Sequence, residues 1–200
     1  MTKLPTGFQL AGVSCGIKST ATEDITLIMA DQPCVAAGVY TRNQVVAAPV
    51  ILDRERTPTD NFRAVVINSG NANACTGALG MEYARRMSAV TAELMHCDAE
   101  QTLVMSTGII GEQLPMEKVE RGISMAAAAL GNSPKHLDAA ARGILTTDTV
   151  VKIAHGGNAE FSLTGIAKGS GMIGPNMATM LGVIMTDLDL SPSQAQEYLR

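Results

Sequence analysis

The chain has 200 residues, of which 46% are hydrophobic and only 3% aromatic, with no tryptophan. This length allows one large domain or two small ones, with a core of aliphatic side chains and the 12 methionines. The net charge is −4 and lysine and arginine form no cluster, so neither nucleic acid nor an anionic membrane is expected as a partner. No apolar run approaches the roughly eighteen residues of a membrane span.

The cysteines and histidines give no sign of a metal site. No two of the four cysteines are closely spaced, and the three histidines are scattered along the chain. The cysteines are therefore expected to be reduced, buried, small apolar residues. Residues 1–5 have no apolar signal region, and a cytoplasmic location is expected.

The first 41 residues predict extended structure. Residues 7–19 are punctuated by glycine and indicate an extended segment. Residues 25–30 and 34–41 are strand-like runs on either side of the turn residues 31–33, which predicts a hairpin.

The secondary structure of residues 45–68 is harder to predict, because a proline interrupts an apolar run. The apolar run 45–52 contains Pro49, which favours an edge strand or an irregular segment. The polar stretch 53–61 indicates a surface loop, and the β-branched residues 63–68 predict a short strand.

The loop at 69–77 allows two interpretations. Its asparagines and glycines fit a tight, ordered turn, or they form an active-site wall that donates amide hydrogen bonds. Residues 78–97 have the apolar spacing of an amphipathic helix. Residues 102–106 predict the next strand, and Thr107 and Gly108 begin the loop after it.

Helix signals dominate the next stretch. Pro115 can open a helix over 116–130. Ser133 is a candidate cap for a further helix that begins at Pro134 and ends near 143–145.

A polar cluster at 146–149 precedes a predicted strand pair. Asp148 in this cluster is interpreted as a cap or turn former rather than a catalytic acid. Residues 149–154 and 160–167 predict two strands around a turn at 155–158.

The segment 168–182 reads KGSGMIGPNMATMLG, a glycine-rich loop that leads into an apolar run from Met180. A run of that length indicates a buried strand. If the bond between Ala178 and Thr179 breaks, Thr179 gains an amine with an ordinary pKa of about 7.7–8.0. Thr179 then supplies both a nucleophilic hydroxyl and its base. Residue type alone favours the simpler interpretation, that Thr179 is the first residue of a strand.

This segment resembles the self-cleavage site of the ArgJ family, bifunctional glutamate N-acetyltransferases and ornithine acetyltransferases of arginine biosynthesis. Four other motifs occur in the family's order and rough spacing, and the resemblance extends from about residue 7 to the last residue. These motifs are NSGNANACTG at 68–77, STGIIG at 106–111, TTDT at 146–149 and GIAKG at 165–169.

The resemblance implies specific roles. Thr179 is the nucleophile, and cleavage falls between Ala178 and Thr179. Thr107 and Gly108 form the oxyanion hole, and Lys168 binds substrate. Thr146 also binds substrate, with Thr147 as the alternative because the spacing differs among members. Without the family context, Lys168 would be interpreted as a solvated surface lysine and Thr107 and Gly108 as a strand-end turn.

The resemblance also implies the fold and the reaction. The fold is α+β, a layered sandwich of stacked β-sheets flanked by helices, similar to the N-terminal-nucleophile hydrolases. The enzyme passes an acetyl group from N-acetylornithine to glutamate through an acetyl-Thr179 intermediate. No cofactor is implied; acetyl-CoA is a second donor in the bifunctional members only.

The expected organisation follows from the cleavage. Residues 1–178 are the α chain and 179–200 the start of a truncated β chain, because the helix from Ser191 and Pro192 runs to the last residue. The resemblance implies α2β2 assembly. Two other functions remain open, a related N-terminal-nucleophile amidohydrolase and an uncleaved, non-catalytic scaffold.

Overall fold

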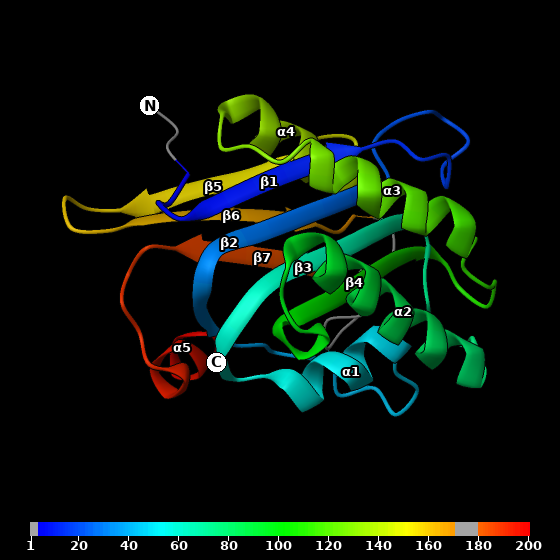
Figure 1. The fold of residues 1–200 in the computed structure, drawn as a ribbon, viewed down its shortest axis with the longest axis horizontal. Coiled ribbons are helices and arrows are strands. Elements are labelled where there is room, and N and C mark those ends of the chain that lie inside the picture. The colour runs from blue at the N-terminus through cyan, green and yellow to red at the C-terminus, as the bar shows by residue number, and fades with distance from the viewer. Residues whose placement is uncertain (1–3, 171–179) are drawn as a thin grey trace.

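The computed structural model describes residues 4–170 and 180–200. In these residues, two β-sheets lie one against the other and helices cover the larger sheet (Figure 1). This arrangement is the α+β layered sandwich that the sequence predicts. None of the helices in the described ranges has the length and apolar character needed to cross a bilayer.

The larger sheet has the strand order β1-β2-β3-β4. Its strands are β1 (Phe8–Val13), β2 (Ile25–Ala36), β3 (Thr59–Asn71) and β4 (Thr102–Ile109). The first three are antiparallel neighbours. β3 and β4 are parallel because the helix α2 (Gly77–Met95) and a short 3₁₀ helix (Ala99–Gln101) return the chain between them. The strands predicted at 63–68 and 102–106 are confirmed, and both are longer than expected.

The predicted hairpin over 25–41 is wrong, because β2 continues through its supposed turn. The pairing of β2 with β3 shifts register between Met29 and Cys34, so Asp31, Gln32 and Pro33 lie in an irregularity of one strand. A proline is tolerated where the ladder is already interrupted, and these three residues are exposed. The turn residues therefore mark a bulge rather than a chain reversal.

The edge strand or irregular segment predicted for 45–52 and the loop predicted for 53–61 are also wrong. Helix α1 (Ala48–Arg56) occupies most of the first stretch and the start of the second, with Pro49 in its first turn, and β3 begins at Thr59. The first backbone N–H groups of a helix have no partner within the helix, so proline is tolerated there. Asp53 of α1 is buried, and its carboxylate accepts the N–H of Val104 at 3.0 Å.

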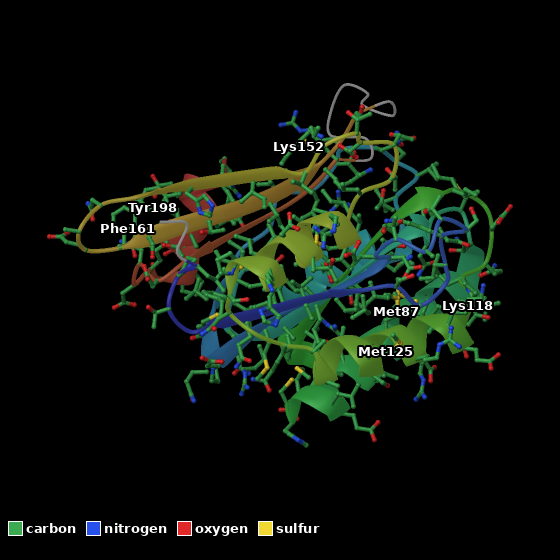
Figure 2. All side chains as sticks on the ribbon, turned by 90° about the horizontal axis from the view of Figure 1, so that it is seen from above. Met87, Lys118, Met125, Lys152, Phe161 and Tyr198 are labelled. Carbon is green, nitrogen blue, oxygen red and sulfur yellow. The ribbon has the colours of Figure 1, made fainter. Side chains whose placement is uncertain are left out.

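Three helices cover one face of the larger sheet: α1, α2 and α3 (Met116–Ala128). The helices predicted at 78–97 and 116–130 are thus confirmed. Figure 2 shows Met87 of α2 in this layer, and its side chain is fully buried. The facing side chains of the sheet alternate along each strand, among them Ile25, Leu27 and Val66.

The opposite face of the larger sheet packs against helix α4 (Pro134–Gly143) and against the second sheet. The predicted helix start is confirmed, with Ser133 at the N-cap and its backbone N–H directed at Nδ1 of His136. α4 approaches β1 closely, since a Cβ at Gly12 would lie 2.0 Å from the carbonyl oxygen of Ala139. Ile166 and Met185 of the second sheet complete this core.

The second sheet is antiparallel, with the strand order β5-β6-β7. Its strands are β5 (Lys152–Gly157), β6 (Ser162–Lys168) and β7 (Leu181–Thr186). The predicted strand pair is confirmed, but its turn lies later than expected. The side chain of Asn158 accepts the backbone N–H groups of Glu160 and Phe161 and so forms the turn there.

The apolar run from Met180 was expected to be a buried strand; the strand is confirmed as β7, but only one of its faces is buried. β7 lies at the edge of its sheet with one face outward, where Ile184 is 62% exposed while Met185 is 2% exposed. After β7, helix α5 (Pro192–Tyr198) begins as predicted after its cap residue Ser191. Gln196 of α5 donates to the carbonyl oxygen of Gly38 at 3.0 Å.

All four cysteines are free thiols. Cys15 is buried, which raises the pKa of its thiol to about 12. Cys34 and Cys97 are half-buried and Cys75 is exposed, so the expectation that the cysteines are buried is confirmed only for Cys15.

Candidate functional site

The site begins where the parallel strands β3 and β4 end side by side. Ser69 pairs with Thr107 and Gly70 pairs with Gly108. Thr107 and Gly108 were expected to begin a loop, but both lie within β4. Gly108 has a φ of +137°, and a Cβ there would lie 2.3 Å from the carbonyl carbon of Gly70. Only glycine fits this backbone approach.

Alternation along the strands directs Ser69 and Thr107 away from the helices that cover the other face. The hydroxyl of Ser69 donates to the carbonyl oxygen of Gly143 at the end of α4. Thr107 is 1% exposed and faces the second sheet. From that sheet, Nζ of Lys168 donates to Oγ1 of Thr107 at 3.2 Å. Two residues that the motifs single out, 61 positions apart, are therefore in contact.

Lys168 is the last residue of β6 and is only 2% exposed. Its interpretation as a solvated surface lysine is therefore wrong. Burial lowers the pKa of its ammonium, Asp148 nearby raises it, and Lys152 lowers it further. A buried lysine of this kind can bind a carboxylate as a point charge.

The polar cluster 146–149 lies next to Lys168. Thr146 is half-buried, and Thr147 is exposed. Asp148, interpreted as a cap or turn former, instead accepts the backbone N–H of a distant residue, Gly169, at 2.8 Å. The sequence pattern did not predict which backbone it would hold, since that contact joins segments 21 positions apart.

Ala178 and Thr179, the predicted cleavage residues, lie outside the described residues. Their roles stay predictions. The nearest described residue after them is Met180, which is 47% exposed. Leu181, the next residue, pairs with Lys168 in the second sheet.

The amides of the loop 69–77 make hydrogen bonds within the loop and to neighbouring segments. Asn73 donates to the carbonyl oxygen of Gly80 at 2.8 Å and accepts the hydroxyl of Thr76 at 2.6 Å. Asn71 donates to the carbonyl oxygen of Glu112 at 3.0 Å. Of the two interpretations of this loop, these bonds favour the ordered turn.

Lys18 is a second cation near the site that the sequence pattern did not single out. The loop between β1 and β2 folds around the buried carboxylate of Asp24, which accepts four successive backbone N–H groups, from residues 15–18. Lys18 thereby packs next to Gly70, whose added Cβ would lie 3.0 Å from its Cγ. The pKa of Lys18 is lowered, first by burial and in small part by the charge of Lys168.

No group of histidine, cysteine, aspartate and glutamate suited to hold a metal ion occurs within residues 4–170 and 180–200. The polar side chains gathered at the ends of β4 and β6 are hydroxyls, ammonium groups and a carboxylate. Such groups suit proton transfer and the binding of charged substrates.

The fold, two packed sheets flanked by helices with this site at their common end, defines the class of N-terminal-nucleophile hydrolase-like proteins. The chain belongs to the ArgJ family, whose family model matches residues 9–200. It is 50% identical to the "Arginine biosynthesis bifunctional protein ArgJ" of Rhodopirellula baltica over 98% of this chain. It is 46% identical to the protein of the same name from Geobacter sulfurreducens over 97% of this chain.

Two solved structures are similar. Ornithine acetyltransferase from Mycobacterium tuberculosis, crystallised with ornithine, has a TM-score of 0.79 and 36% identity, with 87% of this chain and 94% of that chain covered. The arginine biosynthesis bifunctional protein argJ from Bacillus halodurans has a TM-score of 0.74 and 36% identity, with 88% and 97% covered. The chain spans about half the length of the curated relatives it matches, 49% and 50% for the two named above.

Proposed function

We propose that the complete protein is an acetyltransferase of arginine biosynthesis that moves an acetyl group from N-acetylornithine to glutamate. Membership of the ArgJ family supports the pathway. The relative from Mycobacterium tuberculosis, crystallised with ornithine, supports the substrate.

The observation that carries the proposal is one arrangement at the end of the two sheets. Leu181 pairs with Lys168, and Lys168 donates to Thr107. Thr179 is two positions before Leu181, so its Cα lies within about 7 Å of that of Leu181 by chain length alone. This connectivity supports the proposal that Thr179, Lys168 and the Thr107–Gly108 pair act together.

In this proposal the protein cleaves itself between Ala178 and Thr179. The hydroxyl of Thr179 attacks the acetyl carbonyl carbon of N-acetylornithine, and its new amine takes the hydroxyl proton. The tetrahedral oxyanion is stabilised by the hydroxyl of Thr107 and the backbone N–H of Gly108, and each such donor is typically worth about 2.7–4 kcal/mol.

Collapse of this intermediate releases ornithine, whose amine receives the proton, and leaves acetyl-Thr179. The amine of glutamate then attacks the ester carbonyl and frees the Thr179 hydroxyl. Lys168 binds the substrate carboxylate, and Thr146 contributes a further contact, with Thr147 as the alternative. Acetyl-CoA is a second donor if the protein is bifunctional.

The proposal also covers the division of the protein into two chains, their assembly and their location in the cell. Residues 1–178 form the α chain, and 179–200 begin the β chain. Cleaved pairs assemble as an α2β2 heterotetramer in the cytoplasm.

The test is a pair of substitutions at Thr179 in the complete protein, with product analysis. Thr179→Ala is expected to abolish both cleavage and transfer, because it removes the nucleophile. Thr179→Ser is expected to retain some of each, since a hydroxyl remains.

The products of the wild type separate this function from its alternatives. N-acetylglutamate made from N-acetylornithine and glutamate supports the transferase. Release of free acetate that continues unchanged when glutamate is added indicates an amidohydrolase. An inactive, uncleaved wild type indicates a scaffold.

A further inference from the structure

Asp148 is a buried carboxylate that the reaction above does not use. Its side chain is 0% exposed, yet its Oδ2 accepts no hydrogen bond within residues 4–170 and 180–200. Its Oδ1 accepts the backbone N–H of Gly169 at 2.8 Å and forms an ion pair with Lys152 of β5. A buried polar atom left unpaired is costly, so this carboxylate is a poor choice for a purely structural link.

The contacts of Asp148 are made with residues next to Lys168, in the sequence and in the second sheet. The bond to Gly169 fixes the backbone directly after Lys168, at the point where β6 ends. Lys168 then extends to Thr107. Figure 2 shows Lys152 at the end of the second sheet opposite Phe161. Lys168 lies at the same end of this sheet, because Lys152 pairs with Ala167, the residue before Lys168.

The charges around Lys168 are unevenly divided. Among the described residues, the groups whose charge reaches it are Asp148 from the 146–149 cluster, Lys152 from β5 and Lys18 from the loop after β1. Two of these are cations and disfavour a third positive charge, as burial also does. Asp148 is the anion that offsets them.

We propose that Asp148 is a positioning residue of the acetyl-transfer site, which fixes the backbone after Lys168 and keeps that side chain an ammonium directed at Thr107. The naming of the reaction rests on the proposed function; the link between Asp148 and Lys168 does not. The substrate's carboxylate would complete the charge balance of this cluster when it binds to Lys168.

Three substitutions in the complete protein test the proposal. Asp148→Asn keeps an acceptor for the N–H of Gly169 but removes the charge. Asp148→Ala removes both. Lys152→Gln is the matched control, because it breaks the same ion pair from its exposed side and leaves the bond to Gly169 intact.

The kinetic expectation separates these variants. Asp148→Asn should raise KM for the amino-acid substrates about tenfold and leave kcat within about twofold of the wild type, since binding to Lys168 is weakened. Asp148→Ala should lower kcat/KM about a hundredfold, because misplacement also affects the reacting groups. The KM and kcat of Lys152→Gln should stay within about twofold of the wild-type values. Kinetic constants of both Asp148 variants within twofold of the wild type would overturn the proposal.

The second readout is the titration of the Lys168 side chain, followed by NMR of ¹⁵N-lysine-labelled protein, which needs no activity. Asp148→Asn should move the midpoint about one pH unit lower, whereas Lys152→Gln should not lower it. A carboxylate that only stabilises the fold would lower the thermal midpoint and leave this titration unchanged, and that result would contradict the proposal.

These experiments distinguish a failure of the proposed reaction from a failure of the positioning role of Asp148. If the wild type makes no N-acetylglutamate but the Lys168 midpoint shifts in Asp148→Asn, the proposed reaction is wrong and the positioning role stands. If Asp148→Ala does not fold, the titration midpoint of Lys168 in Asp148→Asn alone tests the positioning role.

Discussion

Gly108 shows most clearly how a single residue constrains the site. Its φ of +137° and its contact with the backbone of Gly70 leave no room for a side chain. The same glycine belongs to the pair that is proposed to bind the oxyanion. Backbone geometry and the proposed chemistry therefore both require glycine at this position.

We predict that Gly108→Ala lowers the free energy of unfolding by about 2 kcal/mol or more, because it combines a positive φ with a clash against rigid backbone. Activity should fall with it. Gly111→Ala is the control, since Gly111 also has a positive φ, +90°, but has no heavy atom within 4 Å of an added Cβ. Urea denaturation of both variants measures the difference, and equal losses would show that the contact with Gly70 is unimportant.

The residues of the site were only partly predictable. The motifs named Thr107 and Lys168, but not that they touch across two sheets, because contact over 61 positions depends on how the sheets pack. Asp148 was interpreted locally as a turn former, and its partner Gly169 could not be found from spacing. Lys18 was missed because only the fold of its loop around Asp24 brings it close to Gly70.

At the scale of elements, α1 shows how a buried charge connects two layers. Asp53 of α1 is 5% exposed and accepts the N–H of Val104 in β4. Burial raises the pKa of this carboxyl to about 7, from an ordinary value of 3.8. The folded protein therefore holds a proton that the unfolded chain releases above about pH 4. The contribution of Asp53 to stability is greatest below pH 4 and declines as the pH rises towards 7.

We predict that Asp53→Asn removes this decline, because the amide still accepts the N–H of Val104 and carries no charge. The variant should match the wild type near pH 4 and exceed its free energy of unfolding by about 1–3 kcal/mol at pH 8. Urea denaturation at several pH values tests this. Glu55→Gln on the exposed side of α1 is the control, and a difference independent of pH would refute the prediction.

Elements with strong periodicity or a clear helix start were predicted well, whereas the stretches around Pro33 and Pro49 were not. α2, α3 and α4 were recognised from apolar spacing and start signals. Pro49 was interpreted as a sign of an edge strand although it lies in the first turn of α1, and Pro33 as a turn although it lies in a bulge. Proline is compatible with all of these settings, and the tertiary partners decide among them.

At the scale of the whole molecule, stability depends on the contact between the two sheets. Ile166 of β6 is 1% exposed within the core that the sheets share with α4. Ile184 of the neighbouring strand β7 points to the other side of the same sheet and is 62% exposed. The apolar run of β7 did not reveal which of its faces is covered, because both carry apolar residues.

We predict that Ile166→Ala costs about 2–5 kcal/mol of unfolding free energy in the 200-residue chain, through lost burial and the cavity left behind. Ile184→Ala should change it by no more than about 0.5 kcal/mol. Urea denaturation of the two variants compares the faces directly. Similar losses in both would mean that the second sheet does not pack as described.

The central claim, that one threonine becomes an amine-bearing nucleophile by breaking its own backbone, is tested most directly by the intact mass of the complete, purified, active protein. We predict two polypeptides, one ending at Ala178 and the other beginning with Thr179. A single continuous polypeptide that carries full acetyl-transfer activity would contradict the claim.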